Sequence, residues 1–349
     1  MAEQAEGEQD SHVQSSASST GDSPTMTLQR GASSPFVLES SALDRWAVHR
    51  RGTRAERILF HHLAQVIKSD TLKKRRDLGR QYIQEHEESL ASGGFTIERR
   101  CGYGSIFLGD SEPFQAASAE AKRFLDSCRQ DADLPSKGTI DYIVSAEDTL
   151  NYADFRIGHE SALAKLAVHP EILVPVTKYF DMLPILAAAT VCRSPNATLI
   201  DQSSQMFHLD PEDLTQIKLF IYLNDVDDET GPFTALSSDL SSRVIAQLDY
   251  GIGRLTDEQV AKVVGPHKAR PFWGPAGTGI FCDTNRCFHF GSRPGKRPRD
   301  MLFFMYISPT STWFPLFPGD GEPKTMVSRF LHDQMSPLER ILLGLDLTV

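Results

Sequence analysis

The sequence predicts an α+β protein in which a layer of helices precedes a strand-rich part. Between residues 42 and 182, apolar residues recur at helical spacing, and Gly, Pro or capping residues end most of these stretches. From Ala188 to about Pro309 the pattern changes to short apolar runs separated by Gly and Pro turns. Many short strands joined by such turns are typical of a sandwich or a barrel.

Composition narrows the class of protein further. The chain has 349 residues, enough for a large core, and it contains no uncharged apolar stretch of the roughly 18 residues that a membrane helix needs. Its acidic N-terminus lacks the apolar segment of a secretory signal, and its five cysteines are scattered. We therefore expect a cytoplasmic protein with reduced thiols and no membrane partner. The net charge of -10 argues against general nucleic-acid binding and says little more. A small-molecule substrate is the partner that we expect.

Helices are expected mainly before residue 182. They are predicted at 42–88, 113–129, 159–168 and 170–182, with a further helix after the capping box at 145–148. One strand is predicted within this helical part, at 95–99, because apolar and polar residues alternate there after the Gly93-Gly94 break.

The strand-rich part contains one helical insertion and is followed by a last helix. Strands are predicted at 188–192, 198–200, 217–224, 233–236, 278–283 and 301–307, with helical structure at 240–265. The final helix begins at the capping box of Ser336 and Glu339, with Pro337 as its first residue, and extends through Leu345.

A metal site is predicted just before the strand at 217–224. His208 and Asp210 are one residue apart, and alternate residues of a strand face the same side of the sheet. His289, after the strand at 278–283, is the candidate third ligand. Two histidines and one carboxylate form the facial triad of non-haem Fe(II) oxygenases, which leaves positions free for a chelating cosubstrate and O2.

An arginine that could bind a carboxylate follows the candidate third ligand. Arg299 lies directly before the apolar run at 301–307, where its guanidinium could bind the distal carboxylate of a 2-oxoacid on the iron. If the strand at 217–224 has the expected register, Lys218, Tyr222 and Gln205 lie near the same pocket and are candidates for contacts with 2-oxoglutarate.

Four segments together resemble the phytanoyl-CoA dioxygenase family of Fe(II)/2-oxoglutarate oxygenases: FHLD, FIYLNDVDDETGPFTALSS, GPAGTGIFCDT and RCFHFGSRPGKRPR. The resemblance implies that His208, Asp210 and His289 bind iron. It also implies that Arg299, or Arg297 as the near alternative, binds 2-oxoglutarate. The family often has a serine two residues after the distal histidine, whereas this chain has Gly291 there and Ser292 next.

The resemblance also implies a fold and a reaction. The fold is a double-stranded β-helix (a jelly-roll, cupin-like core) with packed N-terminal and flanking helices. We expect a disordered tail at 1–35, a helical extension with the start of the oxygenase domain at 36–145, the β-helix core at 146–310 and a C-terminal helical tail at 311–349. The implied activity is a dioxygenase that uses Fe(II), 2-oxoglutarate and O2 to hydroxylate an unidentified organic substrate, releasing succinate and CO2.

Four other interpretations compete with this one. His208 and Asp210 could form a structural hydrogen-bonded pair. The β-helix could be a non-catalytic protein that uses its pocket to bind a small molecule. A zinc-dependent hydrolase could use the same triad. Cys282 and Cys287 could bind zinc with His289, although without a second matching pair they are better explained as core cysteines.

Overall fold

The computed structural model describes residues 54–90, 95–129, 142–144, 161–194, 204–291, 293–314, 316 and 336–344. Four expectations lie outside these residues: the tail at 1–35, the helix that follows 145–148, the strand at 198–200 and any contact of Ser292. Within the described ranges, helices occur together with antiparallel sheets, which confirms the α+β class. None of the helices in these ranges is long and apolar enough to cross a membrane.

Two antiparallel sheets make up the strand-rich part. The larger has six strands in the order β1-β7-β4-β9-β3-β2, and the smaller has three in the order β6-β5-β8. The strands of the large sheet are β1 (Tyr103–Phe107), β2 (Tyr142–Val144), β3 (Ile185–Ser194), β4 (Ile217–Tyr222), β7 (Thr278–Asp283) and β9 (Arg299–Ile307). Those of the small sheet are β5 (Thr234–Ala235), β6 (Arg270–Pro271) and β8 (His289–Phe290). The strands predicted at 188–192, 217–224, 233–236, 278–283 and 301–307 are thereby confirmed, with shifted ends in all but β7.

The large sheet is buried on both faces, as β4 illustrates. Ile217, Leu219 and Ile221 pack into the core that the sheet shares with the helices. Phe220 and Tyr222 point to the opposite face and join a second core, which we call the inner core. The inner core also contains Ala235 of the small sheet, so it lies between the two sheets.

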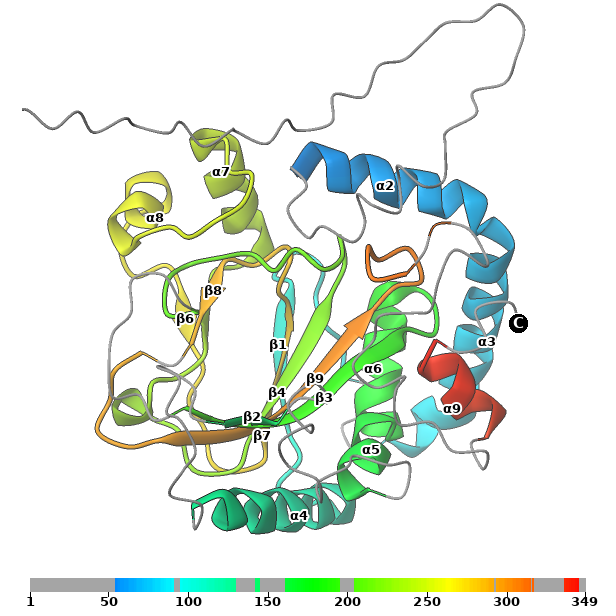
Figure 1. The fold of residues 1–349 in the computed structure, drawn as a ribbon, viewed down its shortest axis with the longest axis horizontal. Helices are drawn as coiled ribbons and strands as arrows, with labels where there is room; N and C mark the ends of the chain where they lie inside the picture. Colours follow the sequence, from blue (N-terminus) through cyan, green and yellow to red (C-terminus); the bar gives the residue numbers. More distant parts are fainter. Residues whose placement is uncertain are drawn as a thin grey trace, which may run out of the picture. The chain divides into compact units, whose positions relative to one another are not determined.

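Helices cover the outer face of the large sheet (Figure 1). The helices on this side are α3 (Ser69–His86), α4 (Glu112–Arg129), α5 (Ala162–Ala167), α6 (Pro170–Phe180) and α9 (Pro337–Leu342). Helix α2 (Arg54–Ile67) precedes α3, and a short 3-10 turn (Glu87–Ser89) follows it. Helices α7 (Ser238–Leu248) and α8 (Asp257–Val264) pack beside the small sheet and confirm the predicted helical insertion.

The predicted capping signals act as expected. Ser336 and Glu339 form the capping box of α9, with Pro337 as the first helical residue, although the helix ends at Leu342 rather than at Leu345. Helix α6 begins at Pro170 and ends at Phe180, and its C-cap residue Asp181 adopts the left-handed conformation with φ of 54°.

Arg75 of α3 is a buried cation that joins three distant parts of the chain. Its guanidinium donates hydrogen bonds to the carbonyl oxygens of Leu183 at 2.9 Å, Pro184 at 2.6 Å and Ile341 at 3.0 Å. Burial lowers the pKa of this side chain to about 9. One side chain thus holds α3, the turn before β3 and the C-terminal helix together.

The strand predicted at 95–99 is wrong. Residues 95–98 belong to neither sheet, and the strand of this region is β1. It begins after Gly102, a glycine in a left-handed conformation with φ of 75°. Phe95 stacks on Phe281 with ring centroids 5.5 Å apart, and Ile97 is buried. The alternation at 95–99 therefore reflects packing onto the core rather than strand pairing.

Candidate metal centre

Backbone pairing places the two candidate histidines side by side. His208 and His289 form an isolated antiparallel bridge in which each amide donates to the other residue's carbonyl oxygen at 3.1 Å. Their imidazole centroids are 4.2 Å apart. Asp210 follows two residues later, and its amide donates to the carbonyl of Thr284 at 2.9 Å. Alternation along the segment turns Asp210 toward the same side as His208.

The three side chains converge on one point. Nε2 of His208 lies 3.7 Å from Oδ1 of Asp210, and Nε2 of His289 lies 3.5 Å from Oδ2. All three residues are buried, and one ligand atom from each lies within 4.8 Å of the others. Two ligands about 2.1 Å from one ion and at right angles to each other are about 3 Å apart, close to these separations. The structure thus brings together the three residues predicted as ligands.

Hydrogen bonds orient both imidazoles for metal binding. Nδ1 of His208 contacts the carbonyl oxygen of Met206 at 2.9 Å, and Nδ1 of His289 contacts that of Cys287 at 3.0 Å. Because a carbonyl can only accept, each Nδ1 carries the proton and each Nε2 presents its lone pair to the centre.

The charge states also suit a cation. Burial, followed by the neighbouring His289, lowers the pKa of His208 to about 3, and burial lowers that of His289 as well. Both rings are therefore neutral at physiological pH, which is the form that binds metals. Burial opposes ionisation of Asp210, but the neighbouring Lys218 ammonium favours it, and the pKa of that carboxyl lies below its ordinary value.

Lys218 contacts the ligand set itself. Its Nζ lies 2.7 Å from Oδ2 of Asp210 and 5.4 Å from the ring centroid of Phe303. Burial alone would lower the pKa of this ammonium, but neighbouring carboxylates, above all Asp210, raise it. The sequence suggested Lys218 as a contact for 2-oxoglutarate, and the structure pairs it with Asp210, a candidate metal ligand.

Arg299 is buried at the start of β9, and only 1% of its surface is exposed. Its Nη1 donates to the carbonyl oxygen of Gly231 at 2.7 Å, and its charge acts on the Tyr222 hydroxyl and the Cys192 thiol of the inner core. A Cβ on Gly291 would lie 3.0 Å from Nη2, so the absence of a side chain there leaves room for the guanidinium.

The other predicted cosubstrate residues lie in different surroundings. Arg297 is half exposed and pairs with Asp227 at the surface. Gln205 is buried, and its carbonyl oxygen accepts a hydrogen bond from Nε of Arg293 at 3.0 Å. Tyr222 donates its hydroxyl proton to the carbonyl of Phe272 at 2.8 Å.

Aromatic side chains pack beside the triad, next to His289. Phe233 lies 5.5 Å from the ring of His289 and 4.5 Å from that of Phe220, which in turn stacks on Phe303 at 5.6 Å. Cys282 and Cys287 are free thiols in the same inner core, as their interpretation as core residues predicts. The side of the triad next to Phe233 is therefore apolar.

A cavity of about 340 Å³ lies elsewhere, between α8 and the small sheet. Phe207 and Phe290 line it. Phe207 precedes His208 by one residue, and Phe290 follows His289 by one residue. Because neighbouring residues alternate between the two faces of a sheet, both phenylalanines point away from the side of the triad. This cavity is therefore separate from the triad.

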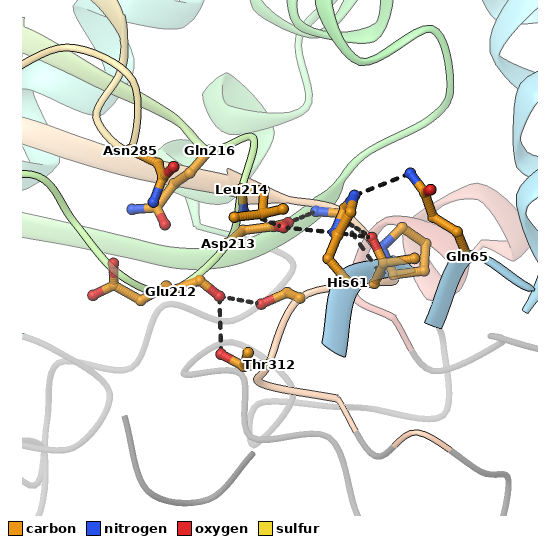
Figure 2. A network of polar contacts seen from close by, with 12 residues as sticks. His61, Gln65, Glu212, Asp213, Leu214, Gln216, Asn285 and Thr312 are labelled. Carbon is orange, nitrogen blue, oxygen red and sulfur yellow. Dashed lines mark hydrogen bonds and ion pairs between the residues drawn. The ribbon is translucent and has the colours of Figure 1, made fainter. Parts of the chain in front are cut away.

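A polar network around Asp213, three residues after Asp210, has no signal in the sequence (Figure 2). Asp213 accepts hydrogen bonds from the amides of Leu214 and Ser308, both at 2.7 Å, and lies 3.7 Å from Nδ1 of His61 on α2. Thr310 lies 2.9 Å from the same nitrogen. Burial raises the pKa of Asp213 to about 7. The network ties the segment after Asp210 to an N-terminal helix, a contact that only the fold creates.

No family model and no curated protein matches the chain. Solved structures do resemble it. SnoN, a non-heme alpha-ketoglutarate-dependent epimerase from nogalamycin biosynthesis, is 20% identical, with 64% of this chain and 88% of SnoN covered and a TM-score of 0.41. HygX from Streptomyces hygroscopicus, solved with nickel and 2-oxoglutarate, is 16% identical over 61% of this chain and 88% of HygX, with a TM-score of 0.40. EctD from S. alaskensis, solved with 2-oxoglutarate and 5-hydroxyectoine, is 16% identical over 65% of this chain and 79% of EctD, with a TM-score of 0.41. All three are distant likenesses.

Proposed function

We propose that this chain is an Fe(II)- and 2-oxoglutarate-dependent dioxygenase that hydroxylates a small organic molecule and releases succinate and CO2. The observation that carries the proposal is the convergence of His208, Asp210 and His289 around one point in an apolar interior. The buried Arg299, whose charge acts on residues of the same inner core, supports it further.

The core, in this proposal, is a double-stranded β-helix spanning residues 146–310. Two antiparallel sheets share the inner core, and the triad lies where the small sheet pairs with the segment that carries His208. Strands β1 and β2, from before residue 146, extend the large sheet at its two edges. The free thiols Cys282 and Cys287 support a reducing compartment such as the cytoplasm.

The donor set fits Fe(II). Two imidazole nitrogens and one carboxylate oxygen are the ligands that non-haem iron oxygenases use. Iron and 2-oxoglutarate, when bound, would supply the activation of O2 and the oxidising power. His208, Asp210 and His289 would hold the ion, and the guanidinium fork of Arg299 would hold the distal carboxylate of the cosubstrate.

The remaining residues orient the imidazoles and shield the centre from water. The carbonyls of Met206 and Cys287 hold the imidazoles in the binding tautomer. Phe220 and Phe233 keep water away from the reacting centre, since both pack into the inner core beside the triad.

The test is succinate release by full-length protein purified without oxygen and loaded with Fe(II). The protein is given 2-oxoglutarate and O2, alone and with a panel of small organic metabolites. We expect succinate in proportion to a hydroxylated product, and none from His208→Ala. Stoichiometric zinc in the purified protein together with metal-dependent hydrolysis would instead support a zinc hydrolase. Tight binding of 2-oxoglutarate without any succinate would support a binding protein.

A further inference from the structure

Lys218 lies on the inner face of β4 and places its ammonium against the candidate metal carboxylate. Its Nζ is 2.7 Å from Oδ2 of Asp210, and the same oxygen is 3.5 Å from Nε2 of His289. Only 14% of the lysine side chain is exposed, and Phe303 lies beside the ammonium. The lysine therefore holds the carboxylate oxygen that faces one of the imidazoles.

A divalent cation in the triad and this ammonium need the same carboxylate. Both would bind the carboxyl group of Asp210, so they would lie within a few ångströms of each other. Like charges at that separation repel far more strongly in a buried site than in water. The surroundings, with Phe303 and the apolar inner core, offer little solvent to screen them. Lys218 should therefore weaken the binding of a metal ion on its own.

A dicarboxylate would remove this repulsion. Arg299 is a second buried cation, and its guanidinium lies against Gly291, two residues after His289, where an added Cβ would be 3.0 Å from Nη2. The metal ion, the ammonium and the guanidinium together carry far more positive charge than Asp210 balances. A chelating dianion supplies two negative charges beside all three.

From this arrangement we infer that Lys218 couples the two ligands of the site: the metal ion binds weakly alone and tightly together with 2-oxoglutarate. The inference rests on the proposed function. It adds a form of regulation, because the metal ion binds tightly only when the cosubstrate is present. Coupling between two ligands is reciprocal, so the metal tightens 2-oxoglutarate by the same factor. Lys218 acts as a positioning residue through Asp210.

The experiment measures binding rather than turnover. Anaerobic calorimetry gives the Kd of Fe(II) for the full-length protein with and without saturating 2-oxoglutarate, and the ratio of the two is the coupling factor. Lys218→Gln and Lys218→Met remove the charge, while Lys218→Arg retains it. We expect both uncharged variants to bind Fe(II) alone at least about tenfold tighter than the wild type. Their coupling factor should fall by at least about tenfold, and Lys218→Arg should keep it.

Two controls separate the possible failures. Lys218→Gln keeps an N–H donor for Asp210, so it carries the test by itself if Lys218→Met fails to fold. Lys262→Gln removes an exposed charge from α8 and should change nothing. Unchanged Fe(II) affinity and unchanged coupling in the uncharged variants would overturn the inference about Lys218 while leaving the proposed function intact. Failure of the wild type to bind Fe(II) under either condition would overturn both.

Discussion

His208 and His289 exchange two backbone hydrogen bonds of 3.1 Å, so the spacing of their imidazoles is set by the main chain. Removing either ring leaves this pairing in place. The metal ligands can therefore be tested separately from the fold that supports them.

His208→Ala and His289→Ala should each abolish stoichiometric Fe(II) binding at micromolar protein, because each leaves two of the three protein ligands. Calorimetry and metal analysis measure the loss, and circular dichroism checks the fold. His62→Ala, which alters an exposed histidine of α2, is the matched control and should bind iron normally. Iron retained at full stoichiometry by either ligand variant would refute the assignment of the triad.

Arg299→Ala should weaken 2-oxoglutarate binding by about 2–5 kcal/mol, because it removes the buried cation that we propose as the bidentate partner of the distal carboxylate. Arg297→Ala should have a much smaller effect, since Arg297 pairs with Asp227 at the surface. Titration of the iron-loaded proteins with 2-oxoglutarate gives both values. The reverse order of the two effects would assign the cosubstrate to Arg297.

Gly291→Ala should weaken 2-oxoglutarate binding several-fold without changing iron affinity. The new Cβ would lie 3.0 Å from Nη2 of Arg299 and 3.6 Å from Nη1, so the guanidinium must shift from its place. Gly251→Ala adds the same methyl group where nothing lies within 4 Å and serves as the control. Equal 2-oxoglutarate affinities in the two variants would show that Gly291 does not shape the site.

Asp213→Asn should flatten the pH dependence of stability. Burial raises the pKa of Asp213 from 3.8 to about 7, so the folded state prefers the protonated form. The preference of the folded state for protonated Asp213 adds to the free energy of unfolding. This contribution is fully present below about pH 4 and is lost as the pH rises through 7. The loss is at most about 4 kcal/mol, at about 1.4 kcal/mol for each pH unit.

Urea unfolding of the wild type and the variant at pH 5 and pH 7.5 measures this difference. Asp283, whose burial raises its pKa to about 6, contributes a slope of the same sign, and His61, whose burial lowers its pKa to about 4, contributes the opposite one. Both remain in Asp213→Asn, so the difference between the two proteins isolates Asp213. Asp110→Asn, at an exposed position, is the control. Parallel pH profiles for the wild type and Asp213→Asn would contradict the prediction.

Features that depend on local sequence could be predicted. The strand at 278–283, the helix that begins at Pro170 and the capping box of Ser336 follow from alternation and from turn chemistry, which act over a few residues. The grouping of His208, Asp210 and His289 was also within reach. Strand periodicity turns His208 and Asp210 to the same side. His289 follows the apolar strand at 278–283, which makes it the candidate third ligand.

Features that depend on long-range packing could not be predicted from the sequence. At 95–99 the alternation is real, but Phe95 packs on Phe281 instead of pairing in a sheet. The partner of Lys218 depends on how close β4 comes to the segment that carries Asp210. The contact between His61 and Asp213 joins residues that are far apart in the chain, and nothing near either one indicates it.

Arg75 has a consequence for how the loss of a helix would be felt inside the protein. Two of its three carbonyl acceptors, on Leu183 and Pro184, are 108 and 109 residues away in the chain, whereas the third, on Ile341 of α9, is 266 residues away. Removal of α9 would leave the guanidinium buried beneath the helix without that acceptor, and a buried donor that loses its partner costs about 1–3 kcal/mol. A cut at the edge of the helical layer would therefore act on the interior through a single cation.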